Sequence, residues 1–109
     1  MSRIFLLLCL TCGFACAISA ASAGDAATGK KLAAMCRTCH GLDGIAKIPI
    51  APHIAGESEI YLQTQLKNFR SGKRAHEMMT VVARDLSDDD IANLAAWYAS
   101  IEITAAMPD

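Results

Sequence analysis

The stretch MCRTCHG, residues 35–41, places two cysteines and a histidine within five positions. Cys36 and Cys39 are separated by two residues, and His40 follows the second cysteine directly. Side chains of these types can bind a metal ion, form a redox-active disulfide or attach a cofactor covalently. The rest of the chain has to discriminate among these three uses.

The first 23 residues have the order of a secretory signal peptide. Arg3 supplies an early positive charge, an apolar run begins at Ile4, and small residues occupy positions 21–23. A charged start, an apolar middle and an A-x-A-type end are typical of a cleaved signal. A membrane anchor is the alternative, but the unbroken apolar run is shorter than the roughly 20 residues that a spanning helix needs. We therefore expect residues 1–23 to be a signal peptide, residues 24–109 to be one exported domain, and no membrane span to remain after cleavage.

Cleavage would leave Cys36 and Cys39 as the cysteines of the domain, because Cys9, Cys12 and Cys16 precede the cleavage site. A lipoprotein signal ending at Cys16 is an alternative, although the preceding GFA lacks the usual leucine. The chain has ten Lys and Arg against eleven Asp and Glu, so it lacks the basic excess of a nucleic-acid-binding protein. A domain this small has a limited core and often depends on a disulfide, a metal or a cofactor. A Cys-x-x-Cys disulfide closes too short a loop to add much stability.

Helical periodicity predicts a first helix from about Asp25 to about Arg37, with Asp25 as its N-cap. Gly29 lies inside this helix, where glycine costs about 1 kcal/mol relative to alanine. A second helix crossing at Gly29 would explain the missing side chain, and Trp97 is the candidate to contact it. Met35 is expected to pack into the core.

Two further helices are predicted from their capping signals. One begins after Ser58 and ends at Gly72, and the other begins after Ser87, with Asp90 in the capping-box position, and runs to about Glu102. The apolar positions of the two helices are Ile60, Leu62, Leu66 and Phe69 in the former, and Ile91, Leu94, Ala95, Tyr98 and Ile101 in the latter. The sequence therefore predicts an all-α domain with three main helices.

Two long irregular stretches separate these helices, GLDGIAKIPIAPHIAGE (residues 41–57) and KRAHEMMTVVARD (residues 73–85). Loops of this length count against a helical bundle that is stable by itself. They are consistent with a domain that wraps around a bound group.

Three candidates can explain the cysteines. A structural zinc site needs four ligands at recognisable spacings, and the other histidines, His53 and His76, do not provide them. A thioredoxin-like dithiol would follow a strand, and no strand pattern precedes Cys36. C-x-x-C-H is the attachment signature of a c-type haem, in which both thiols bond to the porphyrin and the histidine binds the iron. We favour one covalent haem c per chain, held by Cys36 and Cys39, with His40 as the proximal ligand; the zinc and dithiol sites remain alternatives.

The second axial position of the iron is expected to come from a methionine. A Met thioether opposite His gives an electron-transfer centre with a raised potential, whereas an open position gives gas binding or peroxidase chemistry. Met78 and Met79 lie in the loop before the third helix, far from the cysteines in sequence. The residues alone do not decide between them.

Together these motifs resemble class I cytochromes c, in particular the small bacterial periplasmic monohaem type related to the haem domains of di-haem cytochromes and of flavocytochrome c. The resemblance covers nearly all of residues 24–102. It rests on CRTCHG followed by DG, on APHIAGE, on YLQTQLKNFRSGKR and on MMTVVARDLSDDDIANLAAWYAS. It implies a class I cytochrome c fold, with three main helices and long loops around one covalently bound haem.

The same resemblance implies roles for individual residues. Cys36 and Cys39 would form the thioethers and His40 would be the proximal ligand. The family's ligand methionine precedes the leucine of the last-helix motif by seven residues, which favours Met79 and leaves Met78 as the fallback. The carbonyl of Pro52 would accept a hydrogen bond from His40 and so hold its ring.

The resemblance also implies a periplasmic electron carrier rather than an enzyme. Its partners would be a redox donor and a redox acceptor that bind transiently. The alternative is a permanent haem subunit of a dehydrogenase, such as a flavocytochrome complex with a flavoprotein partner. The segment Ile45–Ala51 is more apolar than in relatives and would then be part of the interface.

Overall fold

The computed structural model describes residues 23–109, so the predicted signal peptide lies outside the described residues except for Ala23. The elements are α1 (Ala26–Leu32), the 3₁₀ helix η1 (Ala33–Met35), α2 (Arg37–His40), α3 (Glu59–Ser71), α4 (Met79–Ala83) and α5 (Asp88–Ala99). Residues 23–109 contain no strand, which confirms the all-α prediction. None of the helices in this part of the chain has the length and hydrophobicity needed to cross a membrane.

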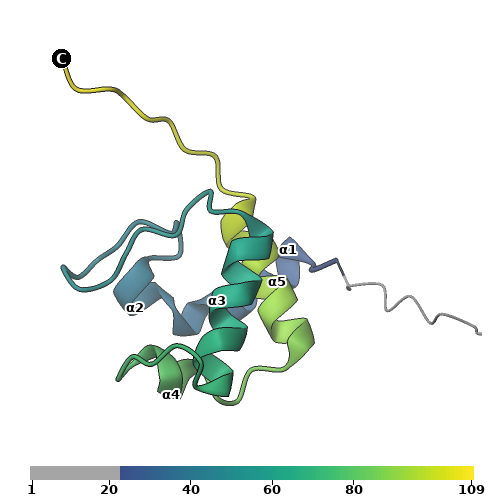
Figure 1. Cartoon of the computed structure of the whole chain (residues 1–109). Helices are drawn as coiled ribbons and strands as arrows, with labels where there is room; N and C mark the ends of the chain where they lie inside the picture. The colour runs from purple at the N-terminus through teal and green to yellow at the C-terminus, as the bar shows by residue number, and fades with distance from the viewer. Residues whose placement is uncertain (1–22) are drawn as a thin grey trace, which may run out of the picture.

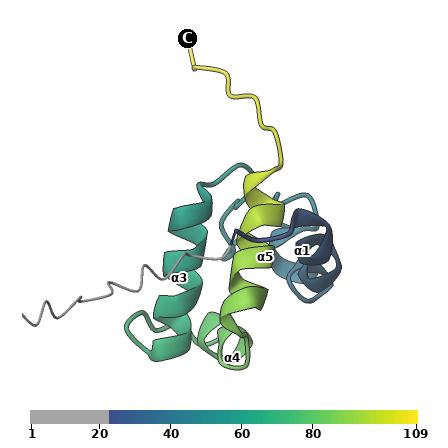
Figure 2. The same cartoon turned by 90° about the vertical axis from the view of Figure 1, so that its right-hand side faces the viewer.

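Helix α5 is the centre of the domain. It packs against α1 and against α3, and α4 packs against α3. Figure 2 shows α5 between these two neighbours, with α4 below α3 and α5. Figure 1 shows α2 and the long loop after it on one side of α3, and the C-terminal residues extending away from the helices.

The core is built on the apolar face of α5. Ile91, Leu94, Ala95 and Tyr98 are buried on this helix, as their spacing predicts. The helix begins with the predicted capping box: the Ser87 hydroxyl accepts from the Asp90 N–H, and the Asp90 carboxylate accepts from the Ser87 N–H. The buried partners contributed by other segments are Ala33, Leu62, Phe69, Ala83 and Leu86.

The contact between α1 and α5 confirms the predicted crossing at Gly29. A Cβ atom at Gly29 would overlap the main-chain carbonyl oxygen of Asn93 and would lie 2.9 Å from the Cβ of Trp97. The Asn93 side chain also accepts a hydrogen bond of 2.7 Å from the N–H of Asp25, the N-cap of α1. The first and last helices are therefore joined at a point where no side chain fits.

Helix α3 has the predicted boundaries, with Ser58 as the N-cap and Gly72, at φ +80°, as the C-cap. Its buried residues are Leu62 and Phe69, and Leu66 packs against the core. Ile60 was expected on this face but is 82% exposed. The reason is geometric, because residues two apart on an α-helix point in nearly opposite directions.

The first and third predicted helices differ from the structure at their ends. The first is interrupted, since α1 ends at Leu32, η1 follows, and α2 begins at Arg37. Met35, expected in the core, lies in the 3₁₀ turn and is 52% exposed. The last helix ends at Ala99 rather than near Glu102, and the hydroxyl of its C-cap residue Ser100 donates to the Trp97 carbonyl at 2.6 Å.

Candidate functional site

The two cysteines lie at the start and near the end of the short helix α2. The Cys36 N–H bonds to the Ala33 carbonyl at 2.9 Å, and the His40 N–H bonds to the Cys36 carbonyl at 2.9 Å. This single turn places both thiols and the imidazole on one compact segment. Both cysteines are partly buried, and within residues 23–109 both are free thiols.

The environments of the two thiols differ. Cys36 packs against the hydrophobic core, next to the residues of α5. Burial raises the pKa of the Cys36 thiol, because the anion would lose its hydration, and the nearby Tyr98 hydroxyl only partly offsets this effect. Cys36 is therefore a neutral thiol at physiological pH.

His40 is buried and its ring orientation is fixed. Its exposed fraction is 8%, and its Nδ1 lies 2.9 Å from the carbonyl oxygen of Pro52. A carbonyl can only accept, so Nδ1 carries the proton and donates it. In the neutral ring Nε2 then has the lone pair, which is the form that binds a metal.

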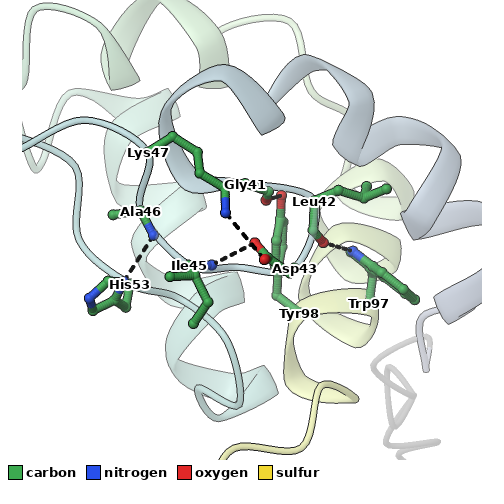
Figure 3. Close-up of polar contacts among 9 residues, drawn as sticks. All are labelled: Gly41, Leu42, Asp43, Ile45, Ala46, Lys47, His53, Trp97 and Tyr98. Atoms are coloured by element: carbon green, nitrogen blue, oxygen red, sulfur yellow. Dashed lines mark hydrogen bonds and ion pairs between the residues drawn. The ribbon is translucent and has the colours of Figure 1, made fainter.

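Two aromatic side chains of α5 hold the backbone that follows His40. The Tyr98 hydroxyl donates to the Gly41 carbonyl at 3.0 Å, and the Trp97 Nε1–H donates to the Leu42 carbonyl at 3.0 Å (Figure 3). Burial raises the pKa of the Tyr98 hydroxyl, so it remains a proton donor. The sequence predicted that these residues pack in the helix interface but did not predict that they hold this loop.

The loop after the motif is also joined to the segment that carries Pro52. The Gly44 carbonyl accepts from the N–H groups of Ile54 and Ala55 at 2.8 and 3.1 Å, and the Lys47 N–H bonds to the Cys39 carbonyl at 2.8 Å. Gly44 has φ +73° and contacts Ala55 so closely that a side chain would not fit. These bonds keep the Pro52 carbonyl next to His40.

The outer edge of this loop has its own polar contacts, drawn in Figure 3. Asp43 accepts from the Ile45 N–H at 3.0 Å and pairs with Lys47 at 3.2 Å, and both contacts lower the pKa of its carboxyl group. His53 is exposed, and its Nδ1 accepts from the Ala46 N–H at 2.9 Å. The His53 side chain therefore holds the backbone of the loop at Ala46, and it does not contribute to the cysteine motif.

The two candidate methionines differ in their surroundings. Met79 is the first residue of α4 and packs, partly buried, against the core. Met78 precedes the helix and is 53% exposed. The sequence placed both in an irregular loop and did not predict α4, whose single turn lacks a standard capping residue.

Comparison with protein families and individual proteins gives concordant matches. The family profile for cytochrome c matches residues 26–102. Cytochrome c4 of Pseudomonas aeruginosa is 40% identical over 109 residues, which are 100% of this chain and 53% of that protein. Cytochrome c-554(548) of Halomonas halodenitrificans is 45% identical over 83 residues, which are 73% of this chain and 100% of that protein. The chain thus spans about half the length of the cytochrome c4 relative.

Solved structures show the same fold. Reduced recombinant cytochrome c4 from Pseudomonas stutzeri matches with a TM-score of 0.71 and 34% identity, over 80% of this chain and 50% of that chain. Thiosulfate dehydrogenase from Marichromatium purpuratum matches with a TM-score of 0.68 and 34% identity, over 81% of this chain and 22% of that chain.

Proposed function

The chain belongs to the cytochrome c family, which implies a covalently bound haem c, and on that premise we propose that it carries single electrons between redox proteins. It is an electron-transfer protein rather than an enzyme, in keeping with the cytochromes to which it is similar. We place it in the periplasm, with residues 1–23 as the signal peptide and residues 24–109 as the monohaem domain. Its donor and acceptor would bind transiently.

Cys36 and Cys39 are the proposed attachment points. Cys36 is the N-cap of α2 and Cys39 lies within it, so both thiols belong to one helical turn, and this supports the role because each sulfur has to form one thioether to the same haem. Cys36 would hold the inner edge of the cofactor, since its side chain already packs against the core.

The observation that supports the proposal most strongly is the hydrogen bond between His40 Nδ1 and the Pro52 carbonyl. It selects the tautomer with a free Nε2 and restricts rotation of the ring, both of which a proximal ligand requires. The residues present therefore fit a haem whose iron is bound by His40 on one side.

Met79 is the proposed ligand on the other side, with Met78 as the fallback. Met79 is partly buried against the core, which supports this choice, whereas Met78 is more than half exposed. A haem held between His and Met supplies a one-electron change of the iron at a raised potential. The protein provides the ligands, the burial and a fixed loop, so that little rearrangement accompanies the transfer.

Intact mass under denaturing conditions tests the attachment. The wild-type protein, produced in a periplasm with haem-attachment machinery, is expected to retain the mass of one haem after unfolding. A Cys36→Ser/Cys39→Ser double variant should lose it, since no thioether remains. Thr38→Ser, inside the same motif, is the matched control and should retain the haem. A wild-type protein whose mass corresponds to the bare chain would contradict the proposal.

A permanent haem subunit of a dehydrogenase or flavocytochrome complex is the second candidate. Leu42, Ile45 and Ile50 are exposed on the loop after the motif, which would suit a stable interface. The similar haem domain within a thiosulfate dehydrogenase chain is consistent with such an assembly. Purification from the native cell discriminates the two: a carrier elutes alone, whereas a subunit elutes with a second chain.

A further inference from the structure

The segment that carries Met79 has little internal support. Helix α4 is five residues long, and every residue from Ser71 to Met78 is exposed. A single helical turn is not stable by itself, because its first N–H groups have no partners within the helix. Something other than helix propensity therefore holds Met79 in place.

His76 supplies a hydrogen-bond acceptor for the first N–H groups of α4. Its Nδ1 accepts from the N–H groups of Met78 and Met79 at 3.3 and 3.4 Å. In return the Thr80 hydroxyl accepts from the His76 N–H at 3.0 Å, and the Thr80 N–H bonds to the His76 carbonyl at 2.9 Å. This is the reciprocal arrangement of a capping box, with a histidine ring in the place of the usual Ser or Thr side chain.

The other end of the segment is fixed by α3. Arg70 donates to the Leu86 carbonyl at 2.8 Å and pairs with Asp88 at 2.6 Å. The chain between His76 and Leu86 is therefore held at both ends, and the His76 end is the one that adjoins the start of α4. Because neighbouring helical residues point about 100° apart, a shift of the chain by one residue could give Met78 the direction that Met79 now has.

We propose that His76 is a positioning residue that, through its reciprocal cap with Thr80, sets the register of α4 so that Met79 rather than Met78 faces the iron. This rests on the proposed function, in which Met79 is the axial ligand. Because Nδ1 of His76 accepts from two backbone N–H groups, the neutral ring carries its proton on Nε2, which then has no lone pair for the iron. His76 therefore acts on the site through Met79.

Imidazole binding to the oxidised holoprotein measures how readily Met79 leaves the iron. His76→Ala removes the cap and is expected to raise the apparent affinity for imidazole about fivefold to tenfold, the effect of losing a helix N-cap. His76→Asn keeps an acceptor at the same place and should stay within about twofold of wild type. Thr80→Val, which removes the other half of the cap, should shift the affinity in the same direction as His76→Ala. Glu77→Ala is the matched control, because Glu77 is exposed next to His76 and is not one of the two capping side chains, and it should have no effect.

Measuring imidazole binding in Met79→Ala protein separates the effect of the His76 cap from the effect of the Met79 ligand. In that background, His76→Ala should have no further effect, because the ligand that it positions is gone. If Met79→Ala alone leaves imidazole binding unchanged, Met79 is not the ligand and the proposed function fails at that residue. If Met79→Ala raises the affinity but His76→Ala does not, the ligand assignment stands and the capping role is overturned.

Amide hydrogen exchange gives a readout that does not depend on the iron. The Met78 and Met79 amides should exchange several-fold faster in His76→Ala than in wild type or His76→Asn. Unchanged exchange at both amides would also overturn the proposal. A loss of global stability without a change in either readout would mean that His76 has only a structural role.

Discussion

Replacing Met79 by alanine is expected to abolish the long-wavelength Met–iron(III) charge-transfer band and to lower the midpoint potential by about 0.1 V or more. The physical reason is that the thioether favours the reduced iron, and axial ligands together set haem potentials over a range of ~0.8 V. The covalent haem should remain, since the thioethers at Cys36 and Cys39 are not touched. Visible and near-infrared spectra with a redox titration of the purified holoprotein provide the measurement.

Met78→Ala is the matched control for this variant. Met78 has the same side chain and the neighbouring position but is 53% exposed, so its removal should leave the band and the potential close to wild type. The opposite pattern, with the band lost in Met78→Ala and kept in Met79→Ala, would move the ligand to Met78.

Gly29→Ala is expected to destabilise the folded protein by about 3 kcal/mol, at the upper end of the range for overpacked positions. The added methyl group would overlap the Asn93 carbonyl oxygen, which belongs to the backbone of α5 and cannot turn aside. The higher helix propensity of alanine, about 1 kcal/mol over glycine, opposes this effect but is smaller. Denaturant unfolding of the holoprotein measures the difference.

Gly72→Ala is the control with the same chemical change in open space. Among the described residues, nothing outside the adjacent chain lies within 4 Å of a Cβ at Gly72, but its φ of +80° disfavours a side chain, so a loss of about 1–2 kcal/mol is expected. Equal losses in the two variants would contradict the packing argument, because only Gly29 lies at the crossing of α1 and α5.

The helix boundaries that the sequence predicts correctly are those set by local chemistry. Ser58, Gly72 and the Ser87–Asp90 capping box act through bonds within a few residues, so their effect can be read without knowing the fold. Gly29 was also informative, because glycine inside a helix is unfavourable unless another element approaches closely.

The features that the sequence did not predict depend on contacts between distant segments or on unusual partners. No local sequence signal predicts the 3₁₀ turn at Ala33–Met35. This turn contains the fully buried Ala33 and connects α1 to α2. Helix α4 was missed because a histidine side chain caps it, and histidine is not a usual capping residue. The hydrogen bonds from Trp97 and Tyr98 to the loop span more than 50 residues and follow only from the packing of α5.

Carbon monoxide added to the reduced wild-type holoprotein tests the central claim most directly. The claim is that this chain carries electrons because His40 and a methionine close both axial positions of its haem. The account predicts that carbon monoxide leaves the visible spectrum unchanged, since no position on the iron is open. Rapid formation of a carbon monoxide complex would mean an open iron, and it would contradict the electron-carrier function in favour of catalysis or gas binding.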